Sequence, residues 1–286
     1  MLAELKHTLR RNRGQLIGWA IGLALYALMM VSFFDSIVGI EGIQEMMQAY
    51  PEDLAAFFGG FGAMNTPKGY LEIYYFNYMP VIIGIFTVGV GAGLLVSDEE
   101  KGTLDLILSY PVSRTALFWG RVLGLLALNA LVLLIAYLSW VLPAQGTGMD
   151  LTWIQILRPF LPLFVQLVFF GALALLLSLV LPSVRSAGML TGGILVGNYL
   201  LIGLSNLNED LRAFIEYTPL HYYQGADAVD GLDWIWLGGI AGVSLVLVLL
   251  AWWRFQGRDI RVAGEGSWHL PALSRLLRRD KPPLEA

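Results

Sequence analysis

Six long stretches of this chain contain no aspartate, glutamate, lysine or arginine, and this pattern limits the folds open to it. A helix needs about 20 mainly apolar residues to cross a bilayer, and each stretch is long enough. Only 14% of all residues are charged, whereas 57% are hydrophobic. Pro143 and the glycines after it predict that the third helix ends near Leu142. We therefore expect an all-α integral membrane protein with six transmembrane helices, at about residues 14–34, 73–97, 122–142, 159–184, 186–208 and 234–253.

The lysines and arginines outside these spans are distributed very unevenly. Of the 18 in the chain, only Lys68, Arg158 and Arg212 lie on one side of the predicted membrane. Positive residues beside spans are retained in the cytoplasm. Both termini and the loop at residues 98–121 are therefore predicted to be cytoplasmic, in a multi-pass protein of the cytoplasmic (inner or plasma) membrane. The basic face suits anionic membrane lipids and implies no nucleic-acid partner.

The segments that flank the transmembrane domain, residues 14–253, predict amphipathic surface helices. In residues 1–13 the leucines share one stripe that basic residues border, which is typical of a helix in the membrane interface. Residues 254–286 form a basic tail with a second short amphipathic helix, which begins at Pro271. The first outer loop shows two groups of apolar residues at helical spacing, namely Ile43, Met46, Met47 and Tyr50, then Leu54, Phe57, Phe58 and Phe61.

The motifs of the common membrane enzymes are absent from the sequence. The three histidines form no H-E-x-x-H zinc motif, no G-x-S-x-G nucleophile motif occurs, and cysteine is missing. No lysine is followed by serine or threonine, as the lysine of a P-loop must be. The chain is therefore predicted not to be an enzyme and to hold no metal or cofactor of its own.

A secondary transporter or a channel is harder to exclude. Ion-coupled carriers usually place ionisable groups within the membrane, and the six predicted spans contain none. A membrane scaffold that transports nothing is a third possibility. Glycine pairs at four-residue spacing predict close packing of helices: Gly18/Gly22, Gly89/Gly93, Gly193/Gly197 and Gly238/Gly242.

The most distinctive cytoplasmic stretch is residues 97–114, SDEEKGTLDLILSYPVSR. After a charged entry and Gly102, the apolar residues Leu104, Ile107 and Leu108 recur at helical spacing until Pro111. This pattern predicts a short interfacial helix at about residues 98–114. The alternative is a solvated loop that only connects two spans.

The pattern E-x-G-T-L-x-x-x-L-x-x-P-V-S-R, from Glu100 to Arg114, resembles the cytoplasmic loop of type-2 ABC (ATP-binding cassette) exporter permeases. The likeness extends to YPEDLAAFFGG, TPKGYL and TPLHYYQGADAVDG in the outer loops. It implies a half-transporter of the type V exporter kind, whose loop forms a coupling helix that docks into a groove of a separate ATPase. The residues that the resemblance assigns to this coupling are Glu99, Glu100, Gly102, Thr103, Leu104, Leu108, Pro111 and Arg114.

The resemblance also implies how the parts of such an exporter work together. Leu104 and Leu108 would fill the ATPase groove, so we expect them to be exposed in the isolated permease. Two ATPase copies would hold ATP and magnesium, and a second permease subunit, identical or paralogous, would complete an alternating-access pathway. An aromatic-rich bundle without charges favours an amphipathic or hydrophobic substrate. Lys68 and Arg158, on the opposite side, are expected to take no part in coupling.

Overall fold

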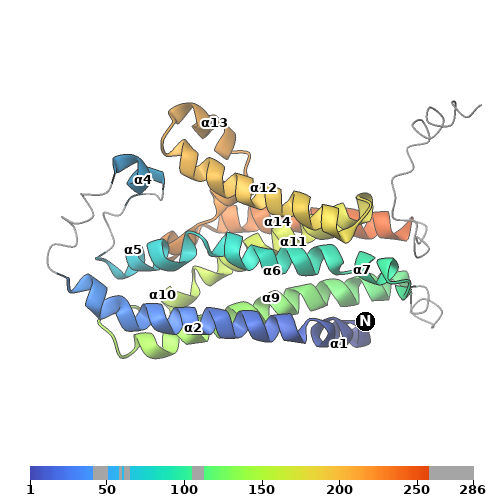
Figure 1. Ribbon diagram of the computed structural model, residues 1–286, viewed down its shortest axis with the longest axis horizontal. Helices are drawn as coiled ribbons and strands as arrows, with labels where there is room; N and C mark the ends of the chain where they lie inside the picture. Colours follow the sequence, from blue (N-terminus) through green and yellow to red (C-terminus); the bar gives the residue numbers. More distant parts are fainter. Residues whose placement is uncertain (41–50, 58–59, 61–64, 105–112, 258–286) are drawn as a thin grey trace, which may run out of the picture.

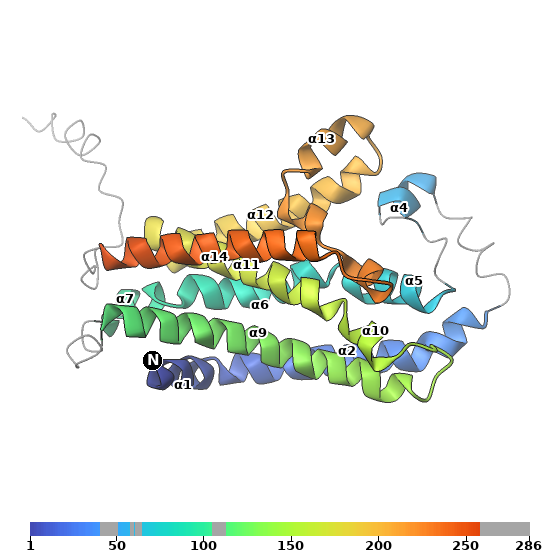
Figure 2. The ribbon, with the colours of Figure 1, turned by 180° about the vertical axis from the view of Figure 1, so that it is seen from behind.

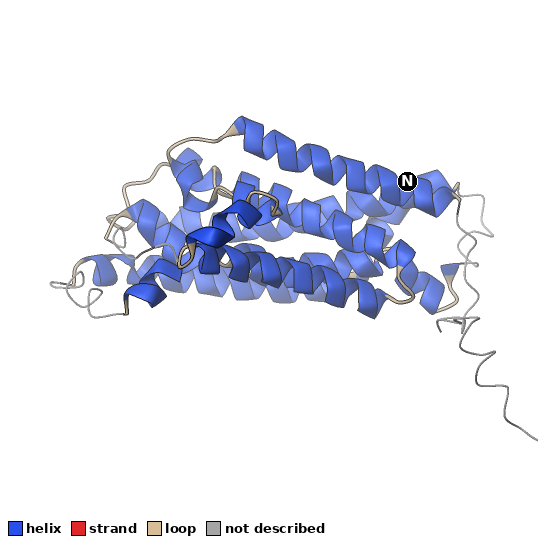
Figure 3. Cartoon of the chain, turned by 90° about the horizontal axis from the view of Figure 1, so that it is seen from above, coloured by secondary structure: helices blue, strands red, loops and turns tan. Residues whose placement is uncertain are grey.

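The computed structural model describes residues 1–40, 51–57, 60, 65–104 and 113–257, and the regular structure of these residues is entirely helical (Figure 3). The long helices run side by side in one bundle (Figure 1). The prediction of an all-α protein with six membrane-spanning helices is confirmed. The segments long and apolar enough to cross a membrane are Arg13–Val38 (α2), Pro67–Gly93 (α5, η1 and α6), Arg114–Ala144 (α9), Trp153–Val180 (α10 and α11), Val184–Ser205 (α12) and Trp234–Gln256 (α14).

Short helices lie at both ends of the bundle (Figure 1). The basic end, as we call it, carries α1 (Leu2–Arg11), α7 (Val96–Glu100), the start of α9 and the end of α14. The chain therefore begins at the same end of the bundle at which α14 finishes. The opposite, acidic end carries α4 (Glu52–Phe57), α5 (Pro67–Leu71), α10 (Trp153–Leu157), α13 (Arg212–Ile215), and the 3-10 turns η2 (Glu209–Leu211), η3 (Pro219–Tyr222) and η4 (Gly225–Val229).

The helix α11 (Phe160–Val180) lies at the centre of the bundle. It packs against α6 (Met79–Gly93), α9, α12 and α14, while α2 lies beside α9 on the outside (Figure 2). Buried aromatic rings fill the space around its first turn, where the Tyr75 ring lies 5.2 Å from Trp140 and 5.9 Å from Phe160, between ring centroids. The outer helices α2, α12 and α14 expose apolar surface, as helices in lipid do.

A close approach of two helix backbones is made by glycines that the sequence pattern did not single out. A methyl group on Gly91 of α6 would lie 2.5 Å from the carbonyl oxygen of Gly171 in α11. The predicted pairs behave differently, because Gly89 has no atom within 4 Å of its Cβ position. The same is true of Gly18, Gly22, Gly193, Gly197, Gly238 and Gly242. These seven glycines therefore bring no two helices together within the described part of this single chain, whereas Gly93 has atoms of Arg11 and Val184 within 4 Å of its Cβ position.

A π-helical segment, η1 (Glu72–Phe76), joins α5 to α6 within the second span. Such segments hold an extra residue in one turn and often occur at functional sites. Glu72 Oε2 accepts a hydrogen bond of 2.6 Å from the backbone nitrogen of Ala226. Burial raises the pKa of Tyr223 well above its usual value, so its hydroxyl stays protonated and donates to the carbonyl of Phe76 at 3.1 Å. These bonds hold η4 against the second span.

Two basic residues strengthen the same contact at the acidic end. Lys68 Nζ lies 2.8 Å from Asp227 Oδ1 and 2.7 Å from Asp230 Oδ2. Arg158 Nη1 donates a hydrogen bond of 3.0 Å to the carbonyl of Val229. Lys68 and Arg158 therefore hold the loop before α14 in place. From the sequence alone they are only two of the few basic residues on their side of the predicted membrane.

Some predicted features lie outside the described residues. They are the first outer-loop helix at residues 43–50, the tail helix that begins at Pro271, and the part of the interfacial helix that contains Leu108 and Pro111. The second outer-loop group is described in part as α4, where the ring of Phe57 lies against Gly203 of α12.

Candidate functional site

The helix α7 contains the first residues of the distinctive stretch 97–114. The residues that follow it in the sequence cap its C-terminal end. Gly102 adopts a left-handed backbone with φ of 65°. Its nitrogen donates to the carbonyl of Glu99 at 2.9 Å, and the nitrogen of Thr103 donates to the carbonyl of Asp98 at 2.8 Å. This pair of bonds is the Schellman arrangement, in which glycine is favoured because it has no Cβ to clash. Gly102 and Thr103 thus fix the direction in which the chain leaves α7.

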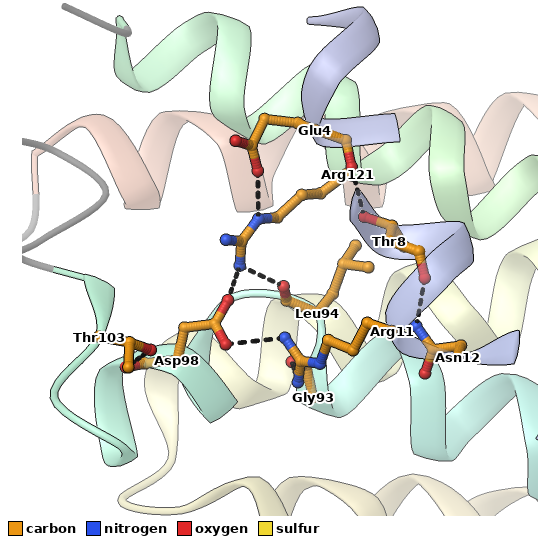
Figure 4. Close-up of polar contacts among 9 residues, drawn as sticks. All are labelled: Glu4, Thr8, Arg11, Asn12, Gly93, Leu94, Asp98, Thr103 and Arg121. Atoms are coloured by element: carbon orange, nitrogen blue, oxygen red, sulfur yellow. Dashed lines mark hydrogen bonds and ion pairs between the residues drawn. The ribbon is translucent and has the colours of Figure 1, made fainter. Parts of the chain in front are cut away.

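The Asp98 carboxylate lies at the centre of an ion-pair cluster at the basic end (Figure 4). Its Oδ2 lies 2.6 Å from Arg121 Nη1, and its Oδ1 lies 2.9 Å from Arg11 Nη1. Arg121 Nε also pairs with Glu4 Oε2 at 3.2 Å. We call these four residues the charged junction, because they come from α1, α7 and α9. Carboxylates and guanidinium groups alternate in it, so each buried charge has an opposite partner.

Backbone carbonyls at the end of α6 complete the coordination of the two arginines (Figure 4). Arg121 Nη1 donates to the carbonyl of Leu94 at 2.8 Å, and Arg11 Nη2 donates to that of Gly93 at 3.2 Å. Carbonyls at the end of a helix lack helical partners and carry partial negative charge, so cations are favoured there. The charged junction therefore also joins α6 to α1 and α9.

The depth of Arg121 corrects two sequence predictions. The third span was predicted to begin at Val122, with Arg121 in the loop, but α9 begins at Arg114 and the Arg121 side chain is only 1% exposed. The spans were also predicted to contain no ionisable group, whereas the helical spans include Arg121 at the basic end and Lys68 and Glu72 at the acidic end. A span defined by the absence of charged residues must stop at Arg121. The sequence pattern does not show that Glu4 and Asp98, which are distant in sequence, compensate its charge.

The two glutamates that follow Asp98 are also engaged with the protein itself. Glu100 Oε1 accepts a hydrogen bond of 2.8 Å from the nitrogen of Val184, the first residue of α12. A carboxylate is favoured at a helix N-terminus, where backbone N–H groups lack partners. Glu99 is buried, with 6% of its surface exposed. Glu100 thus joins α7 to the start of α12.

Leu104 corrects the expectation that the apolar side of the stretch is exposed. The residue is 2% exposed and belongs to the main hydrophobic core. The spacing of apolar residues predicts an apolar face, but not the surface against which it packs. Leu104 covers the bundle, so it is an anchor for the loop in this structure. The partner-facing role assigned to Leu108 and Pro111 falls outside the described residues.

The far side of the same loop is anchored where α9 begins. Ser113 Oγ accepts a hydrogen bond of 3.1 Å from the nitrogen of Ala116, which is a helix N-cap. Arg114 Nη1 donates to the carbonyl of Gln256 at 3.3 Å, and the Gln256 side chain donates to Thr115 Oγ1 at 3.0 Å. The residues on both sides of the segment 105–112, Leu104 and Ser113, are therefore held against the bundle.

The chemistry available at this site is ion pairing and helix capping. In the part of the chain that the structure describes, no three histidine, aspartate or glutamate side chains gather as metal ligands do. The site joins α1, α6, α7, α9 and α12 around one loop. Such an arrangement is suited to passing a displacement of the loop to several helices.

A family model described as ABC-2 family transporter protein matches residues 4–260, which includes every span and the whole charged junction. No curated protein matches the chain.

Proposed function

The chain belongs to the ABC-2 family of transporter proteins, and we propose that it is the membrane permease subunit of an exporter driven by a separate ABC ATPase. Membership in this family makes it a membrane component of an ABC transporter. The export direction and the ATPase are our proposal. In it, the basic end and both termini face the cytoplasm, because lysine and arginine are concentrated there.

The anchoring of the loop at residues 105–112 is the observation that best supports this function. One carboxylate, that of Asp98, pairs with arginines from α1 and α9, and Glu100 binds the start of α12. A rigid connection of this kind transmits a push instead of absorbing it. In the proposal, closure of two ATPase subunits on ATP moves the loop, and the helices around the pathway rearrange in alternating access.

The proposed roles of the loop residues follow from their positions. Gly102, Thr103, Leu104 and Arg114 fix the two ends of the loop, while Leu108 and Pro111 meet the ATPase. Glu99 and Glu100 hold α7 in place. ATP and magnesium bind to the partner, so this chain needs no cofactor.

We further propose that the permease works as a pair of subunits, identical or paralogous. Gly18 and Gly22 of α2 and Gly193 and Gly197 of α12 have no atom within 4 Å of their Cβ positions. Such surfaces allow the backbones of two helices to approach closely within a membrane. In a cysteine-free chain, Gly18→Cys and Gly193→Cys variants should form crosslinks between subunits. A monomer that transports at the full rate would refute the pairing.

The substrate class proposed is amphipathic or hydrophobic molecules. Pathway walls built from α2, α6 and α12 would be apolar and aromatic, as is the cavity of about 470 Å³ beside Trp19, Tyr26 and Tyr78. A charged hydrophilic substrate would lose its hydration there without gaining ion pairs.

Co-purification tests the central proposal. The permease is expressed with ABC ATPases from the same genome, and we expect one of them to remain bound through purification. Leu108→Asp should abolish this association, because it places a charge in an apolar contact, whereas Leu207→Asp at the acidic end should not. Both variants should keep the thermal stability of the parent chain.

Transport assays distinguish the proposal from a secondary transporter or channel. Reconstituted permease and ATPase should move substrate only with hydrolysable ATP. Substrate movement by the permease alone, driven by an ion gradient, would overturn the proposal. So would binding of the ATPase that is unchanged in Leu108→Asp.

A further inference from the structure

A cavity of about 280 Å³ opens at the basic end, next to the charged junction. It lies between the segment around Asn12, where α1 gives way to α2, and the last turn of α6. Gly89 and Gly93 form part of its wall, and the absence of side chains at these positions leaves room for a ligand. The other lining residues are His7, Thr8, Arg11, Asn12, Gln15, Val90, Leu94, Lys101 and Arg121.

The charge of the lining is of one sign. His7, Arg11, Lys101 and Arg121 bring basic groups to the cavity, and no carboxylate is among its lining residues in the described part of the chain. Asp98 and Glu4 offset the two arginines from outside the lining. No ion pair within the described residues compensates Lys101.

One donor of the cluster is also unused. Arg121 is 1% exposed, yet its Nη2 has no hydrogen-bond partner among the described residues. A buried donor without a partner costs free energy, about 1–3 kcal/mol for a neutral group and more for a charged one. The guanidinium therefore has a capacity for an additional acceptor that the chain does not fill.

We propose that this cavity binds the phosphate of an acidic phospholipid headgroup. Basic pockets between transmembrane helices at the membrane surface are suited to such headgroups. The cavity lies at the end of α6, a helix of the second span, and beside the amphipathic α1, so a bilayer that this span crosses would bring its phosphates close to the cavity. Arginine and lysine supply the charge-assisted donors that phosphate oxygens accept.

Occupation of this site would affect the charged junction directly. Asp98 and Glu4 already offset the charges of Arg11 and Arg121, so a phosphate in the cavity would balance the charge of Lys101 and accept hydrogen bonds from the basic lining. It would also join Lys101, at the end of α7, to α1. The lipid would then hold α7 in the position from which the loop at 105–112 starts. This inference requires only that the chain lies in a membrane, and it does not depend on a partner ATPase.

Lipid retention in nanodiscs tests the proposal. The purified full chain is placed in nanodiscs of phosphatidylcholine with a minor fraction of phosphatidylglycerol, and the lipid that stays bound is measured by native mass spectrometry. The parent chain should retain phosphatidylglycerol selectively. Lys101→Gln should lower its affinity about fivefold, the value expected for a basic residue worth about 1 kcal/mol at a membrane surface. His7→Gln should also lower it.

The matched control is Lys6→Gln, which removes one charge from the same surface. Lys6 lies next to His7 in sequence, is exposed, and does not line the cavity. It should leave lipid retention unchanged. Equal losses in Lys6→Gln and Lys101→Gln would show general attraction to a basic surface and would overturn the site. All three variants change exposed residues, and their thermal stability in phosphatidylcholine alone should match the parent.

A separate arm distinguishes lipid from free phosphate. Inorganic phosphate is titrated into nanodiscs of phosphatidylcholine alone, and heat of binding is measured for the parent and for Lys101→Gln. No saturable binding in the millimolar range is expected. Saturable phosphate binding that Lys101→Gln weakens, without selective lipid retention, would assign the cavity to a soluble anion and overturn the lipid assignment.

Discussion

Arg121 Nη1 lies 2.6 Å from Asp98 Oδ2, so an ion pair joins the helix that enters the loop at residues 105–112 to the helix that leaves it. The Arg121 side chain is 1% exposed and that of Asp98 is 9% exposed. Water therefore screens this pair little, and removal of either charge leaves the other buried with one opposite charge fewer. The same pair closes the loop that the proposed ATPase would push.

Asp98→Asn should destabilise the permease strongly. Breaking a buried ion pair by removing one partner costs about 3–5 kcal/mol, because the other charge stays buried. Here two arginines lose their shared carboxylate. Unfolding followed by tryptophan fluorescence in detergent should show a clear fall in Tm. Asp210→Asn, at an exposed position of the acidic end, should leave Tm unchanged, and equal Tm values for both variants would contradict the role of Asp98.

Gly102→Ala should destabilise the end of α7. A side chain at φ of 65° costs about 1–2 kcal/mol. Gly102→Asn should cost less, since asparagine tolerates this backbone region better. Gly14→Ala serves as the control, because Gly14 is helical and has open space around its Cβ position. Gly102→Asn should lower Tm slightly and Gly102→Ala should lower it more. Gly14→Ala should not lower Tm.

Leu104→Ala should destabilise the bundle, contrary to what an exposed docking residue would do. Truncation of a buried leucine costs about 2–5 kcal/mol, and Leu104 is 2% exposed. Leu104→Met should be tolerated within about 1.5 kcal/mol. Leu142→Ala, at a leucine that is 69% exposed, is the control. If Leu104→Ala kept the parent Tm while losing the ATPase, Leu104 would be a docking residue after all.

Gly91→Ala should disrupt the contact between α6 and α11. Its methyl group would lie 2.5 Å from a backbone oxygen, which cannot move without shifting the helix. Overpacking of this kind costs about 1–3 kcal/mol or more. Gly89→Ala, two positions earlier on α6, has open space and should be neutral. The comparison of Tm and of folded yield between the two variants checks the packing.

The double variant Lys68→Gln/Arg158→Gln should lower stability slightly and leave the ATPase association intact. Lys68 pairs with Asp227 and Asp230, whose side chains are well exposed, and exposed ion pairs contribute about 0.2–1 kcal/mol each. Arg158 adds a hydrogen bond to Val229. Co-purification of the ATPase at the parent level, with a small fall in Tm, is expected. Loss of the ATPase would mean that the acidic end influences the loop.

The spans could be predicted from the sequence because they depend on local composition. A run of apolar residues long enough to cross a bilayer is typical of a membrane-spanning helix, so six such runs predict six helices. The limits of the runs were less accurate. Arg121 ended the third run in sequence, but its charge is compensated by Glu4 and Asp98, so α9 continues through it to Arg114.

The charged junction and the packing of Leu104 could not be predicted, because both depend on contacts between distant segments. Arg11 and Arg121 look like ordinary basic residues beside a span until the fold places Asp98 between them. The spacing of Leu104 predicts an apolar face without naming its partner. In the same way, glycine spacing does not reveal that Gly91 meets Gly171.

The π-helical segment η1 fixes how the two halves of the second span face their neighbours. One residue corresponds to a rotation of about 100° along an α-helix. Deleting a single residue from Glu72–Phe76 would therefore turn α5 by about that angle relative to α6, and Lys68 would leave Asp227 and Asp230. The span would keep its length and its apolar character, so it would still insert into the bilayer. The hydropathy of the sequence would be nearly unchanged, while the acidic end of the bundle would lose its alignment.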